Sequence, residues 1–282
     1  MTIVAASIEA KRILLVADCR VTFADGTRHD ALQKVYPLGP NAIVAFAGSV
    51  QLASSALREM ATSKARTRKI KLDVITRRLL RITERKAQHL WEAGRQGADC
   101  SYIIAGYVGA APYLATVGVS GGSAPRVQIM RKAGAYSVIG SGEAERDSCR
   151  HTIARAGLEK FTDEQAAWAF SGFIDAGLSL LSAPQRFDEG IGDLKLHFFV
   201  DETGWQFVPQ HTEMFRGRIA DRNQPLGYAP VNSVSWNKIT RRFLLRDYQS
   251  GSRYPLASIL SFQPYDLRGT VNTEFDPYSL RA

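Results

Sequence analysis

Residues 2–18 read TIVAASIEAKRILLVAD, two apolar runs on either side of a short polar break. Runs of this length, rich in β-branched residues, predict antiparallel strands over residues 3–8 and 13–17. Similar runs predict a second pair of strands over residues 33–38 and 42–47. We therefore expect this part of the chain to belong to a β-rich core.

Helices and further strands are expected in blocks along the chain. Apolar residues at helical spacing predict helices over residues 50–62, 73–94, 143–156 and 163–181. Further β-type runs predict strands over residues 102–108, 113–119, 127–130, 136–139, 194–200 and 205–208. Thr162 and Gln165 have the spacing of a capping box at the start of the last helix. Blocks in this order are typical of antiparallel sheets faced by helix layers, so the fold class is predicted to be an α+β sandwich.

The composition is that of a globular protein. Of the 282 residues, 45% are hydrophobic and 22% are charged, which excludes a mainly disordered, collagen-like or coiled-coil chain. The net charge of +9 is compatible with acidic partners and with simple solubility.

The three cysteines are widely spaced, which argues against a disulfide framework and favours a reducing, cytoplasmic location. No secretory signal is expected at the start of the sequence. Residues 101–125 carry no charge, but their glycines and prolines favour strands over a membrane helix.

The pattern changes after residue 209. Residues 210–282 contain scattered aromatic residues, arginines and prolines without sustained periodicity. We therefore expect a domain over residues 1–209 and a C-terminal extension over residues 210–282 that acts as an oligomer-contact arm. Its aromatic residues are expected to pack against a neighbouring subunit, since such residues are enriched at interfaces, rather than to stack on nucleic-acid bases.

Three polar side chains come together if the first strands pair in register. A turn near Ala10 would place Thr2 opposite Asp18, and a turn at Asp25-Gly26 would place Asp18 opposite Lys34. Neighbouring strands lie about 4.8 Å apart, so the three side chains are expected side by side on one face of a sheet. A shift of one residue would separate them.

These groups are sufficient for catalysis by an N-terminal nucleophile. Removal of Met1 would free the α-amine of Thr2, which titrates at about pH 8 and can accept the proton of the hydroxyl. Lys34 would favour a developing alkoxide, and Asp18 would fix Lys34 in place. The backbone N–H of Gly48 is a candidate oxyanion donor. The plainer alternatives are ordinary N-terminal processing, a cross-strand ion pair and a turn glycine.

Four stretches in this region carry a resemblance to a known family. They are Thr2-Ile3-Val4, VADCRVT at residues 16–22, Gln33-Lys34-Val35 and AFAGS at residues 45–49. Over about residues 2–208 the chain resembles the proteasome β-subunits among the N-terminal-nucleophile hydrolases, including HslV-type proteases and the bacterial Anbu-type relatives.

The resemblance implies a role for each matching residue. Thr2 is the nucleophile with its own amine as the base, Asp18 and Lys34 support it, and the Gly48 amide binds the oxyanion. Ser141, in a Gly-Ser-Gly sequence, matches a serine near the amine.

The resemblance also implies a four-layer α-β-β-α fold, assembly into a ring or another oligomer, and a peptide-binding site. The backbone of Thr22 would align an extended peptide. An apolar specificity pocket would be lined by Val21, Leu32, Tyr36, Phe46 and Val50. The alternative is that these five side chains are simply part of the core, the commoner position of such residues.

One part of the sequence departs from the family pattern. The family has a late aspartate followed by a Ser-Gly loop, and here Asp188 is the candidate acid that supports the amine. The sequence Glu189-Gly190-Ile191-Gly192 that follows it contains no serine.

No cofactor or metal ion is expected. The five histidines are too dispersed for a recognisable metal motif. A run of lysines and arginines between residues 64 and 86 favours a solvated or subunit-facing surface over a nucleic-acid site, because no groove-reading motif accompanies it.

The function expected from these features is that of a cytoplasmic threonine peptidase. It would cleave amide bonds of peptides or proteins through an acyl ester on Thr2, within a homo-oligomer. An acylase for small amides would use the same chemistry. The alternative from another class is a catalytically silent, proteasome-like assembly protein that keeps Met1 and whose extension binds partners or nucleic acid. The involvement of a regulatory ATPase is left open.

Overall fold

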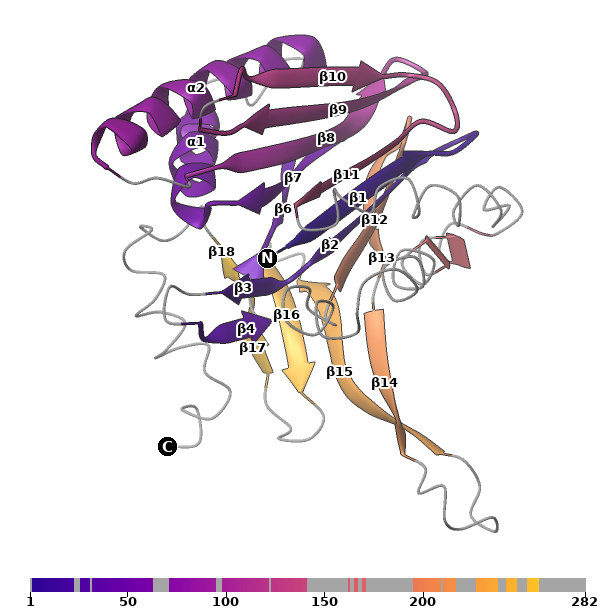
Figure 1. Ribbon diagram of the computed structural model, residues 1–282. Helices are drawn as coiled ribbons and strands as arrows, with labels where there is room; N and C mark the ends of the chain where they lie inside the picture. Colours follow the sequence, from indigo (N-terminus) through magenta and orange to yellow (C-terminus); the bar gives the residue numbers. More distant parts are fainter. Residues whose placement is uncertain are drawn as a thin grey trace.

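Two five-stranded antiparallel sheets lie face to face at the centre of the molecule (Figure 1). The first sheet has the strand order β11-β1-β2-β12-β13, and the second has the order β10-β9-β8-β7-β6. The first sheet consists of β1 (Ile3–Ile8), β2 (Ile13–Asp18), β11 (Tyr136–Gly140), β12 (Lys195–Asp201) and β13 (Gly204–Val208). The second consists of β6 (Val35–Gly39), β7 (Ala42–Gly48), β8 (Cys100–Val108), β9 (Ala111–Val119) and β10 (Arg126–Met130).

The computed structural model describes most of the chain up to residue 140 and several shorter segments after it. The described residues are 2–22, 26–30, 32–62, 71–94, 98–121, 123–140, 162, 165–166, 169–170, 195–208, 210–216, 227–237, 242–247 and 253–258.

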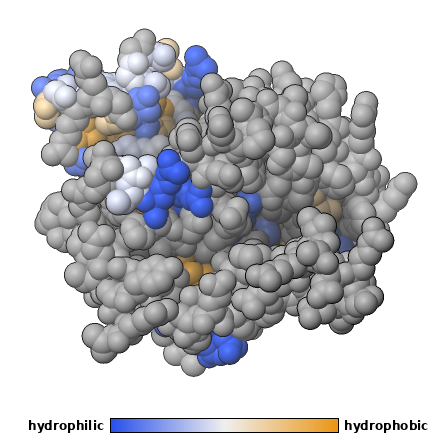
Figure 2. All heavy atoms as spheres, turned by 60° about the horizontal axis from the view of Figure 1, so that its bottom comes forward, coloured by the Kyte–Doolittle hydropathy of each residue, from blue (hydrophilic) through white to orange (hydrophobic). Residues whose placement is uncertain are grey.

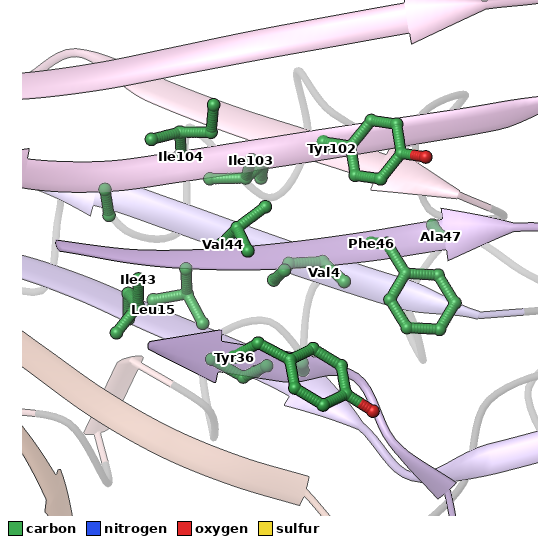
Figure 3. Packing of buried hydrophobic residues seen from close by; sticks show 14 of the residues in the cluster. Val4, Leu15, Tyr36, Ile43, Val44, Phe46, Ala47, Tyr102, Ile103 and Ile104 are labelled. Atoms are coloured by element: carbon green, nitrogen blue, oxygen red, sulfur yellow. The ribbon is translucent and has the colours of Figure 1, made fainter. Parts of the chain in front are cut away.

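Side chains from both sheets interlock to form the main core. Val4 and Leu15 of the first sheet meet Val44 and Phe46 of the second, and all four are at most 1% exposed (Figure 3). The alternation of a strand sends every second side chain into this layer, and the intervening side chains face outward. The apolar runs that predicted β1, β2 and β7 are continuous because these strands are buried on both faces.

Two helices, α1 (Val50–Thr62) and α2 (Leu72–Glu92), cover the outer face of the second sheet (Figure 1). The hydroxyl of Thr76 on α2 is 2.8 Å from that of Tyr113 on β9, and Leu79 is fully buried. None of the described helices combines the length and apolarity that a membrane span requires. The uncharged residues 101–125, for which strands were predicted, contribute β8 and β9.

The outer face of the first sheet has a second apolar cluster. Ala166 and Phe170 are helical and pack with Ile3, Leu14 and Val16. The expected capping box is present, since the Gln165 N–H donates to Thr162 Oγ1 at 3.4 Å and the Thr162 N–H donates to Gln165 Oε1 at 3.3 Å. The α+β sandwich is confirmed. The remaining residues of the helices predicted over 143–181 lie outside the described residues.

The segment after residue 209 contains strands that the sequence did not predict. A four-stranded antiparallel sheet has the order β14-β15-β16-β17. Its strands are β14 (Gln210–Arg216), β15 (Gly227–Asn237), β16 (Arg242–Asp247) and β17 (Arg253–Pro255). A last strand, β18 (Ala257–Ser258), pairs in parallel with β5 (Leu32–Gln33).

The C-terminal sheet packs on the core of its own chain. Phe243 lies 5.8 Å from Phe198 and 4.9 Å from Phe207 between ring centroids, and it is 1% exposed. The expectation that the aromatic residues of this segment pack on a neighbouring subunit is therefore wrong for Phe243. The first sheet offers two aromatic rings at this edge, and ring pairs of this geometry are favourable.

Large apolar side chains are rarely exposed among the described residues. On the face shown in Figure 2, the hydrophobic residues appear as small separate areas. The large hydrophobic side chains that are exposed are Val74, Val108, Val127 and Ile129.

Candidate active site

Lys34 joins Thr2 and Asp18 in one buried cluster. Its Nζ donates to Thr2 Oγ1 at 2.7 Å and to Asp18 Oδ1 at 2.9 Å. Lys34 is 2% exposed and Asp18 is fully buried, so the two charges interact with little screening by water. The three side chains predicted to meet are thus in contact.

The path that brings them together differs from the predicted one. In β1 and β2, Val4 is opposite Ala17, so Ile3 rather than Thr2 is opposite Asp18. The predicted register is wrong by one residue because the chain turns through two residues, with the Glu9 N–H bonded to the Arg12 carbonyl.

Lys34 also does not lie on a strand beside Asp18. The neighbours of β2 are β1 and β12, whereas Lys34 immediately precedes β6 of the second sheet. The hairpin predicted around Asp25-Gly26 forms instead between the short strands β3 (Arg20–Thr22) and β4 (Arg28–Asp30). The cluster is therefore built between the two sheets and not on one face of a single sheet.

Hydrogen bonds hold the carboxylate of Asp18 on several sides. The Ile3 N–H donates to Oδ1 at 3.0 Å and the Arg20 N–H donates to Oδ2 at 3.2 Å. A buried ion costs several kcal/mol of solvation unless such donors and an opposite charge replace water. Asp18 has both, which fixes the acceptor that orients Lys34.

The backbone around Lys34 is held just as closely. The Phe46 N–H donates to the Lys34 carbonyl at 3.2 Å, and the hydroxyl of Tyr36 donates to the Gln33 carbonyl at 2.6 Å. The Gln33 side chain donates from Nε2 to the Val35 carbonyl at 2.8 Å. A long flexible lysine side chain thus starts from a fixed backbone.

Gly48 ends β7 close to Asp99, at an exposed position. Its φ of +104° is one that glycine adopts readily, and a Cβ here would collide with the Asp99 carbonyl. The next residue, Ser49, donates its N–H to that carbonyl at 2.7 Å. The sharp turn requires glycine whether or not the amide binds an oxyanion, and the latter role stays a prediction.

Gly140 connects β11 to the cluster. It is opposite Ile3 on β1 and has a φ of +85°. A Cβ at this position would collide with the Thr2 carbonyl and lie 3.1 Å from the Cβ of Ala47. Gly140 therefore lies between Thr2, the predicted nucleophile, and Ala47 near the end of β7. Ser141, Asp188 and Met1 lie outside the described residues.

The residues predicted to line a pocket are mostly part of the core. Val21, Leu32, Tyr36 and Phe46 belong to the cluster between the sheets and are at most 7% exposed. Val50 is partly buried against that cluster, and Thr22 is exposed at the end of β3. Their part in substrate binding stays a prediction.

Two buried basic residues on β12 were not predicted from the sequence. Lys195 is opposite Asp18 and is 3% exposed, and His197 is 3% exposed. Burial, with the charge of Lys195 as a smaller cause, lowers the pKa of His197 to about 3. Neither ring nitrogen of His197 has a hydrogen-bond partner among the described residues. The alternation of residues 194–200 could have signalled that both lie on one face.

Two basic residues of the run noted in the sequence are engaged within the chain. Arg85 and Lys86 on α2 reach Glu59 on α1 at 2.5 Å and 3.2 Å. In the part of the chain that the structure describes, no group of three or more metal-ligating side chains is found.

Comparisons with known proteins agree on the family. Residues 1–144 match the Proteasome subunit family. Among solved structures, the chain is similar to "Anbu (ancestral beta-subunit) from Yersinia bercovieri", with a TM-score of 0.53 and 12% sequence identity over 73% of this chain and 86% of that chain. At this identity the likeness shows the fold alone, and no curated protein matches the sequence. Because the family match spans half of the chain, the chain belongs to the proteasome subunit family, with the sandwich fold of its β-subunit-like N-terminal-nucleophile members.

Proposed function

We propose that the chain is a threonine-dependent amide hydrolase that cleaves peptides or proteins within a homo-oligomeric, cytoplasmic assembly. The observation that carries this proposal is the 2.7 Å contact from the buried ammonium of Lys34 to Thr2 Oγ1. A threonine hydroxyl is a weak nucleophile at neutral pH, and a fixed positive charge next to it stabilises the alkoxide as it forms.

The reaction begins when the bond before Thr2 is cleaved and the α-amine is released. Thr2 Oγ1 attacks the carbonyl carbon of the substrate, and the hydroxyl proton passes to the α-amine. The amide C–N bond then breaks, and the leaving amine takes that proton. This leaves an acyl ester on Thr2.

Water completes the cycle. The α-amine takes a proton from water as its oxygen attacks the ester carbonyl, the ester C–O bond breaks, and Thr2 Oγ1 is reprotonated. The product is a carboxylic acid. Lys34 remains an ammonium throughout, Asp18 keeps it in place, and the Gly48 amide is the proposed donor to the oxyanion.

The test is covalent labelling at Thr2. A peptide epoxyketone, which reacts with a neighbouring amine and hydroxyl together, is expected to modify the N-terminal peptide of the mature chain. Thr2→Ala should abolish the modification because the hydroxyl is gone. The matched control is Thr27→Ala, at an exposed position, which should leave labelling unchanged.

Intact mass separates this function from the silent alternative. Chains isolated from the native cell are expected to begin at Thr2. Quantitative retention of Met1 would contradict the hydrolase and favour an assembly protein, as would labelling that persists in Thr2→Ala.

A further inference from the structure

The C-terminal segment returns to the residues directly before Lys34. Ala257 is opposite Leu32 and Ser258 is opposite Gln33 in the parallel pairing of β18 with β5. In Figure 1, β18 lies close to the start of β6, although the two strands are far apart in the sequence. Residues 256–258, here named the C-terminal strap, thus bring residues from the end of the described chain to the candidate site.

Leu256 anchors the strap in the core. Its N–H donates to the Phe243 carbonyl at 2.8 Å, and its side chain is 2% exposed. It belongs to the same apolar cluster as Leu32, which is fully buried. The strap is therefore attached both to the C-terminal sheet and to the core between the main sheets.

β5 is enclosed between the strap and the residue that follows Asp18. On the side away from the strap, the Leu32 N–H donates to the Cys19 carbonyl at 2.9 Å. Cys19 follows Asp18 directly, and Lys34 follows β5 directly. The strap thus covers the edge of the strand that sets the position of the lysine relative to the carboxylate.

This support matters because β5 is very short. It has two residues, too few to be stable without neighbours on both edges. The ammonium of Lys34 must stay within hydrogen-bond distance of Thr2 Oγ1, and a displacement of about 1 Å can cost on the order of 100-fold in rate. A contact that fixes β5 therefore also fixes the ammonium of Lys34.

We propose that the C-terminal strap positions Lys34, with Leu256 as a positioning residue, so that the extension is part of the catalytic unit of its own chain. The proposal rests on the proposed role of Thr2. It assigns the extension a function distinct from oligomer contact.

The experiment compares Leu256→Ala with two variants in the full chain. Leu256→Met keeps the apolar volume and should retain the wild-type labelling rate. Leu256→Val is a milder truncation in case Leu256→Ala does not fold. Leu79→Ala is the matched control, because Leu79 is a fully buried core leucine on α2, a helix that packs against α1, β8 and β9.

The readout is the rate of epoxyketone labelling of Thr2 as a function of pH. Leu256→Ala is expected to label about tenfold or more slowly and to shift the acidic limb of the profile to higher pH, since a displaced ammonium no longer disfavours protonation of the amine. Leu79→Ala should lower stability without moving the limb. If Leu256→Ala and wild type have equal labelling rates and the same acidic limb, the proposed role of the strap is wrong.

Hydrogen exchange keeps this test separate from that of the proposed function. If the wild-type protein is not labelled at all, the proposed hydrolase function is wrong. Hydrogen exchange at the amides of residues 33–35 then tests whether the strap holds β5 and Lys34 in place. Faster exchange there in Leu256→Ala, but not in Leu79→Ala, supports the strap, and unchanged exchange refutes it.

Discussion

Lys34 and Asp18 form a buried ion pair, so removing one charge leaves the other without a partner in this pair. Lys34→Met should lower the free energy of unfolding by about 3–5 kcal/mol, because it leaves a buried carboxylate without its cation. It should also reduce labelling of Thr2 by orders of magnitude. Adding Asp18→Asn removes the orphan charge, so the double variant should regain much of the stability and none of the labelling rate.

Chemical denaturation and labelling on the same samples check this prediction. If the double variant regained labelling together with stability, Lys34 would be a structural ion-pair partner and nothing more. Wild type and both single variants complete the cycle.

At the scale of the element, β12 carries an unusual histidine. Because the pKa of His197 is lowered to about 3, the unfolded chain binds a proton below about pH 6.5 that the folded chain does not. Stability should be complete above that pH and fall as the pH drops toward 3. The slope from this residue approaches about 1.4 kcal/mol per pH unit.

Urea unfolding at pH 7 and pH 5 measures the effect. His197→Leu should reduce the loss of stability between these two pH values by about 2 kcal/mol, because the variant has no proton to bind. The control is Phe199→Leu, at a buried position on the same strand with no titrating group, which should leave the pH dependence unchanged. A loss that is the same in His197→Leu as in wild type would refute the prediction.

The elements differ in how well the sequence predicted them. Strands such as β1 and β7 are long apolar runs, and α1 has a clear helical period, so local pattern was sufficient for them. The strands β14 to β17 were missed because the chain there has mixed aromatic and charged residues, and the sheet is stabilised by contacts such as that of Phe243 with Phe198.

The contact among Thr2, Asp18 and Lys34 was predicted, but the path of the chain that brings them together was not. The spacing of Thr2, Asp18 and Lys34 pointed to a meeting, yet the register of β1 with β2 depends on the turn at residues 9–12. No local pattern shows that Lys34 crosses from the other sheet. Lys195 was missed because its burial follows from the pairing of β12 with β2, which are distant in sequence.

At the scale of the whole molecule, the net charge of +9 bears on assembly. Copies of a basic chain repel one another, and salt screens that repulsion. We expect a mass that is a multiple of 31.1 kDa, with the oligomer more populated at about 300 mM salt than at about 50 mM. Sedimentation velocity at both salt concentrations is the measurement. A monomer under both conditions would contradict the proposed homo-oligomer.

The contact of Lys34 with Thr2 spans two separate sheets, and this has a consequence for newly synthesised chains. A chain that has formed only its first sheet has the hydroxyl, the carboxylate and Lys195, but it lacks the ammonium of Lys34 beside Thr2. Under the proposed function, a newly synthesised chain thus gains hydrolytic activity only after the two sheets have packed together. By the same proposal, copies whose sandwich has not closed cannot cleave other nascent polypeptides, so folding itself limits premature cleavage.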